Sequence, residues 1–169
     1  MHTSELFKTK RVLSFEIFPP KRTGSINTIY DTVDELKELN PDFISVTYGA
    51  GGSKSNSDTL KIASDIKNKY GIESVAHLPC INLTKKDVLE IMGHLEDAKV
   101  ENILALRGDT NPNITPKNEF KYASDLISFI KGNSNFNIIA ACYPEGHIES
   151  PTVVEDIHNL KVKVDAGVN

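Results

Sequence analysis

Short apolar runs alternate with segments of helical periodicity along this chain, and the alternation occurs five times. The apolar runs end in polar clusters and occupy residues 12–16, 43–47, 74–77, 103–109 and 138–143. Helical periodicity characterises the segments that follow them, residues 26–39, 58–70, 85–98, 120–131 and 153–166. The pattern predicts five strands, each followed by a helix.

The helical segments carry an apolar stripe and start signals. Four side chains in the first segment recur at three- or four-residue steps and predict one buried stripe: Ile29, Val33, Leu36 and Leu39. Three later segments have start signals: Ser57 before Asp58, Thr84 followed by Asp87, and Ser124 near Asp125. We therefore expect helices to begin at these positions, with side-chain oxygens capping free backbone N–H groups.

The strands are almost wholly apolar, which is typical of strands covered on both faces. This favours a right-handed parallel α/β sheet, open or closed, formed by a single domain over residues 1–169. Gly167 predicts a turn that would feed a sixth strand, yet the sequence ends at Asn169. A (β/α)8 barrel takes about 250 residues, so a barrel would lack three βα units here. A five-stranded open sheet is the alternative.

Composition narrows the class of protein. The chain has 39% hydrophobic and 25% charged residues, which fits a globular domain with one core. A formal charge of −4 and the lack of aromatic residues between basic runs argue against nucleic acid as a partner. No apolar stretch is long enough for a signal segment or a membrane span, so we expect a cytoplasmic protein. Cys80 and Cys142 are too few for a disulfide framework.

The polar clusters predict a ligand site, because the carboxyl ends of parallel strands meet at one rim, and they favour an enzyme. Glu16 lies inside an apolar strand, where desolvation would raise its pKa and suit it to general acid catalysis. A solvated position on an edge strand is the alternative. Arg107, Gly108 and Asp109 end the fourth strand, where they can hold an anion and admit a ligand, although this tripeptide is also a common turn.

Two further clusters leave alternatives open. Residues 48–53 (YGAGGS) can offer N–H groups to a phosphate, but they match no dinucleotide or P-loop motif, which favours a connecting loop. Four residues at strand ends are of the types that bind zinc: His77, Cys80, Cys142 and His147. Their spacing lacks the tight pairs of structural zinc sites, and we expect no metal. His77 and Tyr143 would instead present ring donors to a planar ligand.

Taken together, these motifs resemble the methylenetetrahydrofolate reductase family. The resemblance is carried, in the family's order, by SFEIFPP (14–20), PDFISVTYGAGGS (41–53), AHLPC (76–80), LALRGD (104–109), YASD (122–125), YPEGH (143–147) and LKVKVDAG (160–167). It covers nearly the whole chain, and the combination is far more specific than any one block.

The resemblance implies a (β/α)8 TIM barrel, of which this chain carries the first five βα units, with FAD at the carboxyl ends of the strands. It implies reduction of 5,10-methylenetetrahydrofolate to 5-methyltetrahydrofolate, with NAD(P)H as hydride donor. Glu16 matches the catalytic acid that helps open the folate's methylene bridge, and Asp109 matches the carboxylate that orients substrate and tunes the flavin. The matches to FAD contacts are Thr47, His77, Arg107, Gly108, Asp109, Ala123, Tyr143, His147, Asp156, Asn159 and Lys163.

The sequence departs from the family pattern in two places. Val162 stands where related sequences carry a basic residue of the flavin-phosphate site, which shifts that role to Lys163 and Lys161. The family's barrel continues past Asn169 with three more strands, so we expect a fragment with exposed edges at its first and fifth strands. We expect it to form a homo-oligomer or to cover those edges with shifted helices, to bind FAD weakly and to lack reductase activity. A non-catalytic flavin- or ligand-binding half-barrel is the alternative.

Overall fold

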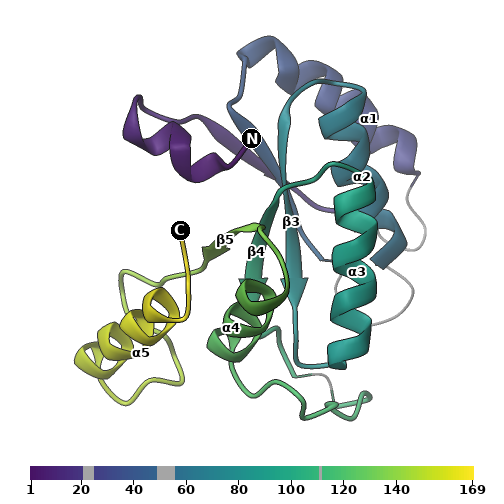
Figure 1. Ribbon diagram of the computed structural model, residues 1–169. Coiled ribbons are helices and arrows are strands. Elements are labelled where there is room, and N and C mark those ends of the chain that lie inside the picture. Colours follow the sequence, from purple (N-terminus) through teal and green to yellow (C-terminus); the bar gives the residue numbers. More distant parts are fainter. Residues whose placement is uncertain (21–24, 49–55, 111) are drawn as a thin grey trace.

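The structure is a computed structural model that describes residues 1–20, 25–48, 56–110 and 112–169. As predicted, it contains one sheet of five parallel strands, and their order in the sheet is β1-β2-β3-β4-β5 (Figure 1). The strands are β1 (Ser14–Ile17), β2 (Phe43–Val46), β3 (Glu73–Pro79), β4 (Asn102–Leu106) and β5 (Asn137–Ala140). Within the described residues, β1 pairs with β2 alone and β5 with β4 alone, so the sheet is open at both edges.

A helix follows every strand, which confirms the predicted alternation. The helices are α1 (Ile26–Leu36), α2 (Asn56–Asn68), α3 (Lys85–Asp97), α4 (Ala123–Asn133) and α5 (Val153–Asp165). Neighbouring parallel strands joined in chain order by right-handed crossovers place their helices on one side of the sheet. The structure thus has the α/β architecture of a partial TIM barrel.

Strand register divides the side chains between two faces of the sheet. One row packs against the helices and is buried: Ile17, Val46, Ala76, Ile103 and Ile138. Glu16, Ser45 and His77 occupy neighbouring strand positions and therefore point to the opposite face. On that face β3 is buried, whereas Leu104, Leu106 and Ile139 of β4 and β5 are partly exposed. In the described chain the expectation of strands covered on both faces is therefore confirmed for β3 and wrong for β4 and β5.

The predicted helix starts and stripe are confirmed only in part. Thr84 caps α3, where its hydroxyl accepts from the Asp87 N–H (3.1 Å) and the Asp87 carboxylate accepts from the Thr84 N–H (2.7 Å). Ser57 and Ser124 lie inside their helices rather than before them. Leu39 is 58% exposed, because α1 tightens at its end into the 3₁₀ helix η2 (Lys37–Leu39), which rotates that residue off the buried face.

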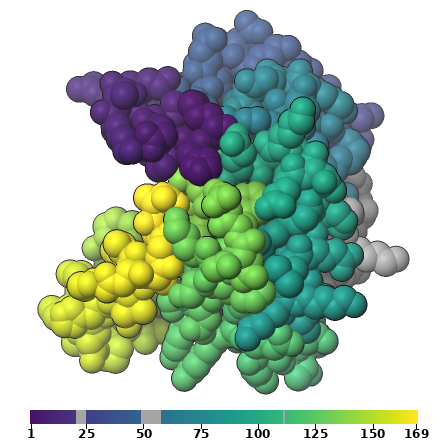
Figure 2. All heavy atoms as spheres, in the orientation of Figure 1, coloured from purple at the N-terminus to yellow at the C-terminus, as the bar shows by residue number. Residues whose placement is uncertain are grey.

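A 3₁₀ helix, η1 (Thr3–Lys8), lies across the amino ends of the strands, and the sequence pattern did not predict it. The fully buried Asn102 holds it in place. Asn102 Oδ1 accepts from the Thr3 N–H and from Asn137 Nδ2, both at 2.9 Å, and its Nδ2 donates to the carbonyls of Met1 (3.1 Å) and Ser74 (3.2 Å). Figure 2 shows this segment (purple) against the last residues of the chain (yellow).

The end of the chain runs along β5. Gly167 forms the predicted turn after α5, with φ of 124°, a region that favours glycine. The Asn169 N–H then donates to the Ile138 carbonyl (3.0 Å), and the Ile138 N–H donates to Asn169 Oδ1 (3.1 Å). Residues 168 and 169 thus lie beside the β5 edge. None of the helices in the described ranges combines the length and apolar character needed to cross a bilayer.

Candidate active site

Three polar side chains from β1, β2 and β3 meet on the face of the sheet away from the helices. The Ser45 hydroxyl donates a long hydrogen bond of 3.4 Å to Glu16 Oε2, and His77 Nε2 lies 3.3 Å from the same oxygen. Ser45 and His77 are buried, at 8% and 7% exposure. The register that aligns Glu16 with Ser45 across β1 and β2 produces this cluster.

Glu16 itself is not buried. Its side chain is 48% exposed, so the desolvation predicted from its apolar strand is wrong for the described chain. The reason is that the apolar neighbours Phe15 and Ile17 alternate to the helix side, whereas Glu16 points to the open face on the edge strand. An exposed carboxylate can exchange a proton with solvent or with a bound ligand.

His77 is the buried member of the cluster. Burial lowers the pKa of His77, and the negative charge of Glu16 partly opposes this by raising it. Although Nε2 lies close enough to Glu16 for a charge interaction, this buried atom has no hydrogen-bond partner in the described residues. An unpaired buried nitrogen is costly unless a ligand satisfies it, and such atoms often mark a binding site.

Replacing Glu16 by glutamine should lower the pKa of His77 further. The substitution removes the negative charge that favours the imidazolium, while the burial that disfavours it remains. An NMR titration of the His77 Cε1–H resonance measures this, with wild type expected to titrate below the usual value of about 6.5. Glu90→Gln removes an exposed carboxylate on α3 and serves as the matched control. An upward shift in Glu16→Gln would contradict the assigned interaction.

Thr47 follows β2, and two hydrogen bonds fix its backbone. Its N–H donates to the Ile17 carbonyl (2.9 Å), and its carbonyl accepts from the Thr59 hydroxyl of α2 (3.0 Å). The whole residue is 9% exposed. Next to it, burial raises the pKa of Tyr48 to about 12. The rest of the glycine-rich segment predicted as a connecting loop, residues 49–53, lies outside the described residues.

Arg107, Gly108 and Asp109 form the turn after β4. Gly108 has φ of 84°, and a Cβ there would lie 2.8 Å from Pro79 Cβ, so glycine is required by conformation and by space. The Arg107 carbonyl accepts from the Ile81 N–H (2.9 Å), which ties this turn to the end of β3. Asp109 is exposed beyond it.

Arg107 makes a two-pronged ion pair with a residue that the sequence analysis did not single out. Its Nη1 and Nη2 donate to the two carboxylate oxygens of Glu149 at 2.6 and 2.9 Å. The hydrogen bond with Glu149 raises the pKa of Arg107, and the same bond lowers the pKa of Glu149. The only sequence signal for Glu149 is its position two residues after His147, and this signal is too weak to predict a site residue.

A pocket of about 170 Å³ lies between the end of β5 and α5. It is lined by Cys142, Tyr143, Pro144, Val153, Asp156, Ile157, Leu160 and Lys163. Lys163 Nζ donates to the Ala141 carbonyl (2.9 Å), and the Tyr143 ring packs edge-on against His147 with centroids 5.0 Å apart. The pocket therefore combines an apolar wall, an aromatic ring, one cation and one carboxylate, a mixture that is typical of sites for small organic ligands.

The structure brings most of the predicted site residues to the carboxyl ends of the strands, in two groups. Glu16 and His77 belong to the cluster on β1 to β3, whereas Tyr143, Asp156 and Lys163 line the pocket beside α5. Ala123 begins α4 and is 8% exposed. Asn159 is exposed on α5 and does not line the pocket. Ser45 and Glu149 are the polar neighbours that sequence reasoning missed.

The four residues considered for zinc differ in their surroundings. Cys80 is buried, where its Sγ lies 3.8 Å from the Arg107 carbonyl, and burial raises the pKa of its thiol to about 12. Cys142 is exposed in the pocket beside α5. In the described ranges no three histidine, cysteine or acidic side chains cluster closely enough to hold a metal ion. Cys80 acts here as a small core residue, since a zinc ligand must be a thiolate.

Comparison with known proteins matches this arrangement to one family. The model of the family described as Methylenetetrahydrofolate reductase matches residues 2–169. Proteins named 5,10-methylenetetrahydrofolate reductase from Buchnera aphidicola subsp. Baizongia pistaciae and Escherichia coli K12 are 44% and 40% identical over 156 and 157 residues, 92% and 93% of this chain. Methylenetetrahydrofolate reductase 1 of Schizosaccharomyces pombe is 34% identical over 169 residues, 96% of this chain and 28% of its own length.

A solved structure shows the same fold at low sequence identity. The 4-hydroxy-tetrahydrodipicolinate synthase of Methylacidiphilum fumariolicum SolV superposes with a TM-score of 0.59 at 14% identity, covering 93% of this chain and 52% of that one. The chain likewise spans about half the length, 52%, of the two bacterial relatives above. The family match over nearly the whole chain, with these identities, establishes that the chain belongs to the methylenetetrahydrofolate reductase family.

Proposed function

We propose that this chain forms the flavin-binding rim of a reductase that converts 5,10-methylenetetrahydrofolate to 5-methyltetrahydrofolate, with FAD as cofactor and NAD(P)H as hydride donor. The observation that carries the proposal is the meeting of Glu16, Ser45 and His77 at the carboxyl end of the sheet. The relatives named for this reaction support the substrate class.

The residues present fit FAD. The unpaired His77 Nε2 offers a buried polar atom to a ligand. Lys163 supplies a cation suited to a phosphate. Arg107, Tyr143 and His147 would complete the binding groups, with Thr47, Ala123, Asp156 and Asn159 as further contacts. When bound, FAD supplies hydride chemistry that amino-acid side chains lack.

The chain's own residues would supply orientation and a proton. Glu16 would donate that proton to a folate nitrogen as the methylene bridge opens, and its exposure allows it to be protonated again from solvent. The Ser45 hydroxyl, itself buried, fixes one carboxylate oxygen of Glu16. Asp109 would accept hydrogen bonds from the folate ring and orient it.

A non-catalytic flavin-binding half-barrel is the second candidate function. It is favoured by the sheet that the described residues form, which is open at both edges. We further propose a cytoplasmic location and self-association. The free edges of β1 and β5 support association, as do exposed apolar side chains of α5 such as Val154 and Ile157.

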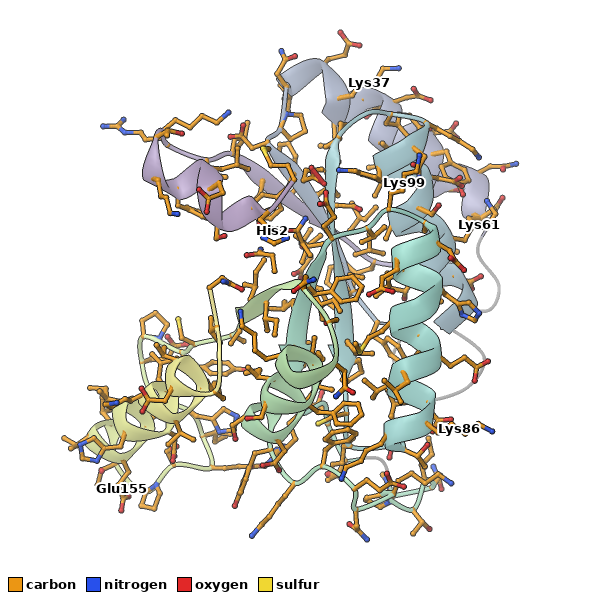
Figure 3. The ribbon with its side chains drawn as sticks, in the orientation of Figure 1. His2, Lys37, Lys61, Lys86, Lys99 and Glu155 are labelled. Carbon is orange, nitrogen blue, oxygen red and sulfur yellow. The ribbon has the colours of Figure 1, made fainter. Side chains whose placement is uncertain are left out.

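Titration of the purified chain with FAD tests the proposal. We expect saturable quenching of flavin fluorescence and, for Lys163→Met, affinity lower by about ten-fold, because a charge-assisted phosphate contact is lost. Lys37→Met is the control, since Lys37 lies at the opposite end of the molecule (Figure 3) and pairs with Asp34. No saturable binding by wild type, or an equal loss in both variants, would contradict the proposal. Turnover of NADH with the folate would exclude the second candidate.

A further inference from the structure

The Arg107–Glu149 pair connects two loops at the rim. Arg107 ends β4, and Glu149 lies between β5 and α5. Two parallel N–H to oxygen bonds of 2.6 and 2.9 Å use one proton on each terminal nitrogen of the guanidinium. A guanidinium has five N–H groups, and the other three have no hydrogen-bond acceptor among the described residues. The Arg107 side chain is only 29% exposed, so this contact orients a half-buried group.

Glu149 is itself held in a fixed turn. The Ser150 N–H donates to the His147 carbonyl (2.9 Å), and the Glu149 N–H donates to His147 Nδ1 (3.1 Å). Asp156, in the first turn of α5, accepts from the His147 N–H (3.1 Å) and from the Ser150 hydroxyl (2.9 Å). The carboxylate of Glu149 therefore approaches Arg107 from a turn anchored to α5 rather than from a freely moving loop.

We propose that Glu149 is a positioning residue that fixes the Arg107 guanidinium for ligand binding. A free arginine side chain has about 2 kcal/mol of rotamer entropy, part of which is lost whenever a ligand orders it. The bidentate pair orders it in advance, so binding no longer bears that cost. This inference rests on the proposed function for the identity of the ligand, FAD, but not for the ordering of Arg107.

A competing role makes the opposite prediction. If Glu149 merely occupied the position of an anionic ligand group, its removal would free Arg107 and strengthen binding. The anchored turn argues against that role, because the contacts of His147 and Ser150 with Asp156 keep the backbone of Glu149 beside Arg107.

A double-mutant cycle on FAD affinity tests the inference. We expect Glu149→Gln to weaken binding by about five-fold, since glutamine offers one acceptor oxygen in place of two. In an Arg107→Gln background the same substitution should have no further effect, because Glu149 acts through Arg107. Glu155→Gln removes another exposed carboxylate, at the outer end of α5 (Figure 3), and should leave affinity unchanged. Stronger binding by Glu149→Gln, or an equal effect in both backgrounds, would overturn the inference.

A second readout needs no ligand and separates this inference from the proposed function. In wild type, NMR of the Arg107 guanidinium should show slow rotation about the Nε–Cζ bond and separate Nη–H signals, because two of its protons are held. These signals should merge in Glu149→Gln and persist in Glu155→Gln. Failure of wild type to bind FAD would then reject the proposed function alone. Merged signals already in wild type would reject the positioning role.

Discussion

Replacing Asn102 by aspartate should destabilise the protein by about 4 kcal/mol at neutral pH, although the two side chains have nearly the same shape. Asn102 is fully buried at the start of β4. Its Nδ2 donates to the carbonyls of Met1 and Ser74 at 3.1 and 3.2 Å. In the variant a carboxylate oxygen would face those two carbonyl oxygens without a proton to donate. The substitution therefore loses two hydrogen bonds and buries a charge, and the ammonium group of the neighbouring Met1 is already paired with Glu73 and Glu101.

The loss should depend on pH in a defined direction. Burial raises the pKa of the introduced carboxyl above the unfolded value of about 3.9. Below pH of about 3.9 the introduced carboxyl is protonated in both the folded and the unfolded protein. The loss of stability there comes only from the hydrogen bonds that Asn102 Nδ2 donated. As pH rises above that value, the unfolded state releases its proton first and gains stability relative to the folded state. The difference from wild type should accordingly grow between pH 4 and pH 7.

Urea unfolding of variant and wild type at both pH values measures this difference. Asn27→Asp is the matched control, because Asn27 is exposed in the first turn of α1, where a negative charge is tolerated. We expect its free energy of unfolding to lie within about 0.5 kcal/mol of wild type. A loss for Asn102→Asp that is small, or that shrinks with rising pH, would show that the buried network does not hold η1 to the strands.

The succession of strands and helices along the chain could be predicted from the sequence because it depends on local periodicity. Apolar runs such as residues 103–106 form strands, and the capping box of Thr84 and Asp87 is complete within four residues. The network around Asn102 could not be predicted in the same way. It joins Thr3 to residues about a hundred positions away, and no local pattern encodes that contact.

The candidate site likewise has features that the local sequence determines and features that depend on distant parts of the chain. The sequence predicted which residues would reach the rim, since a residue at a strand's carboxyl end is placed there by the fold. It failed on their surroundings: Glu16 is exposed because burial depends on what covers the open face. Glu149 was missed because its partner Arg107 lies 42 residues earlier, in a different βα unit.

Gly108→Ala should cost about 3 kcal/mol of stability, the second largest effect expected. A positive φ costs a non-glycine residue about 1 kcal/mol or more, and overpacking adds 1–3 kcal/mol. At Gly108 both apply, since φ is 84° and the new Cβ would lie 2.8 Å from Pro79 Cβ, on a rigid ring. Any relief requires the β4 turn to move, which would displace Arg107 and Asp109. FAD affinity should therefore fall as well, measured by fluorescence titration below the unfolding transition.

Gly93→Ala provides the control with the opposite sign. Gly93 lies in the middle of α3, and a Cβ there would meet nothing within 4 Å. Alanine should therefore stabilise the helix by about 0.5–1 kcal/mol. Urea unfolding of the two variants thus separates the general effect of adding a methyl group from the specific requirement for glycine at residue 108. Equal effects in both, or a Gly108→Ala protein as stable as wild type, would mean that the close approach of β3 and β4 at this turn is not needed for folding.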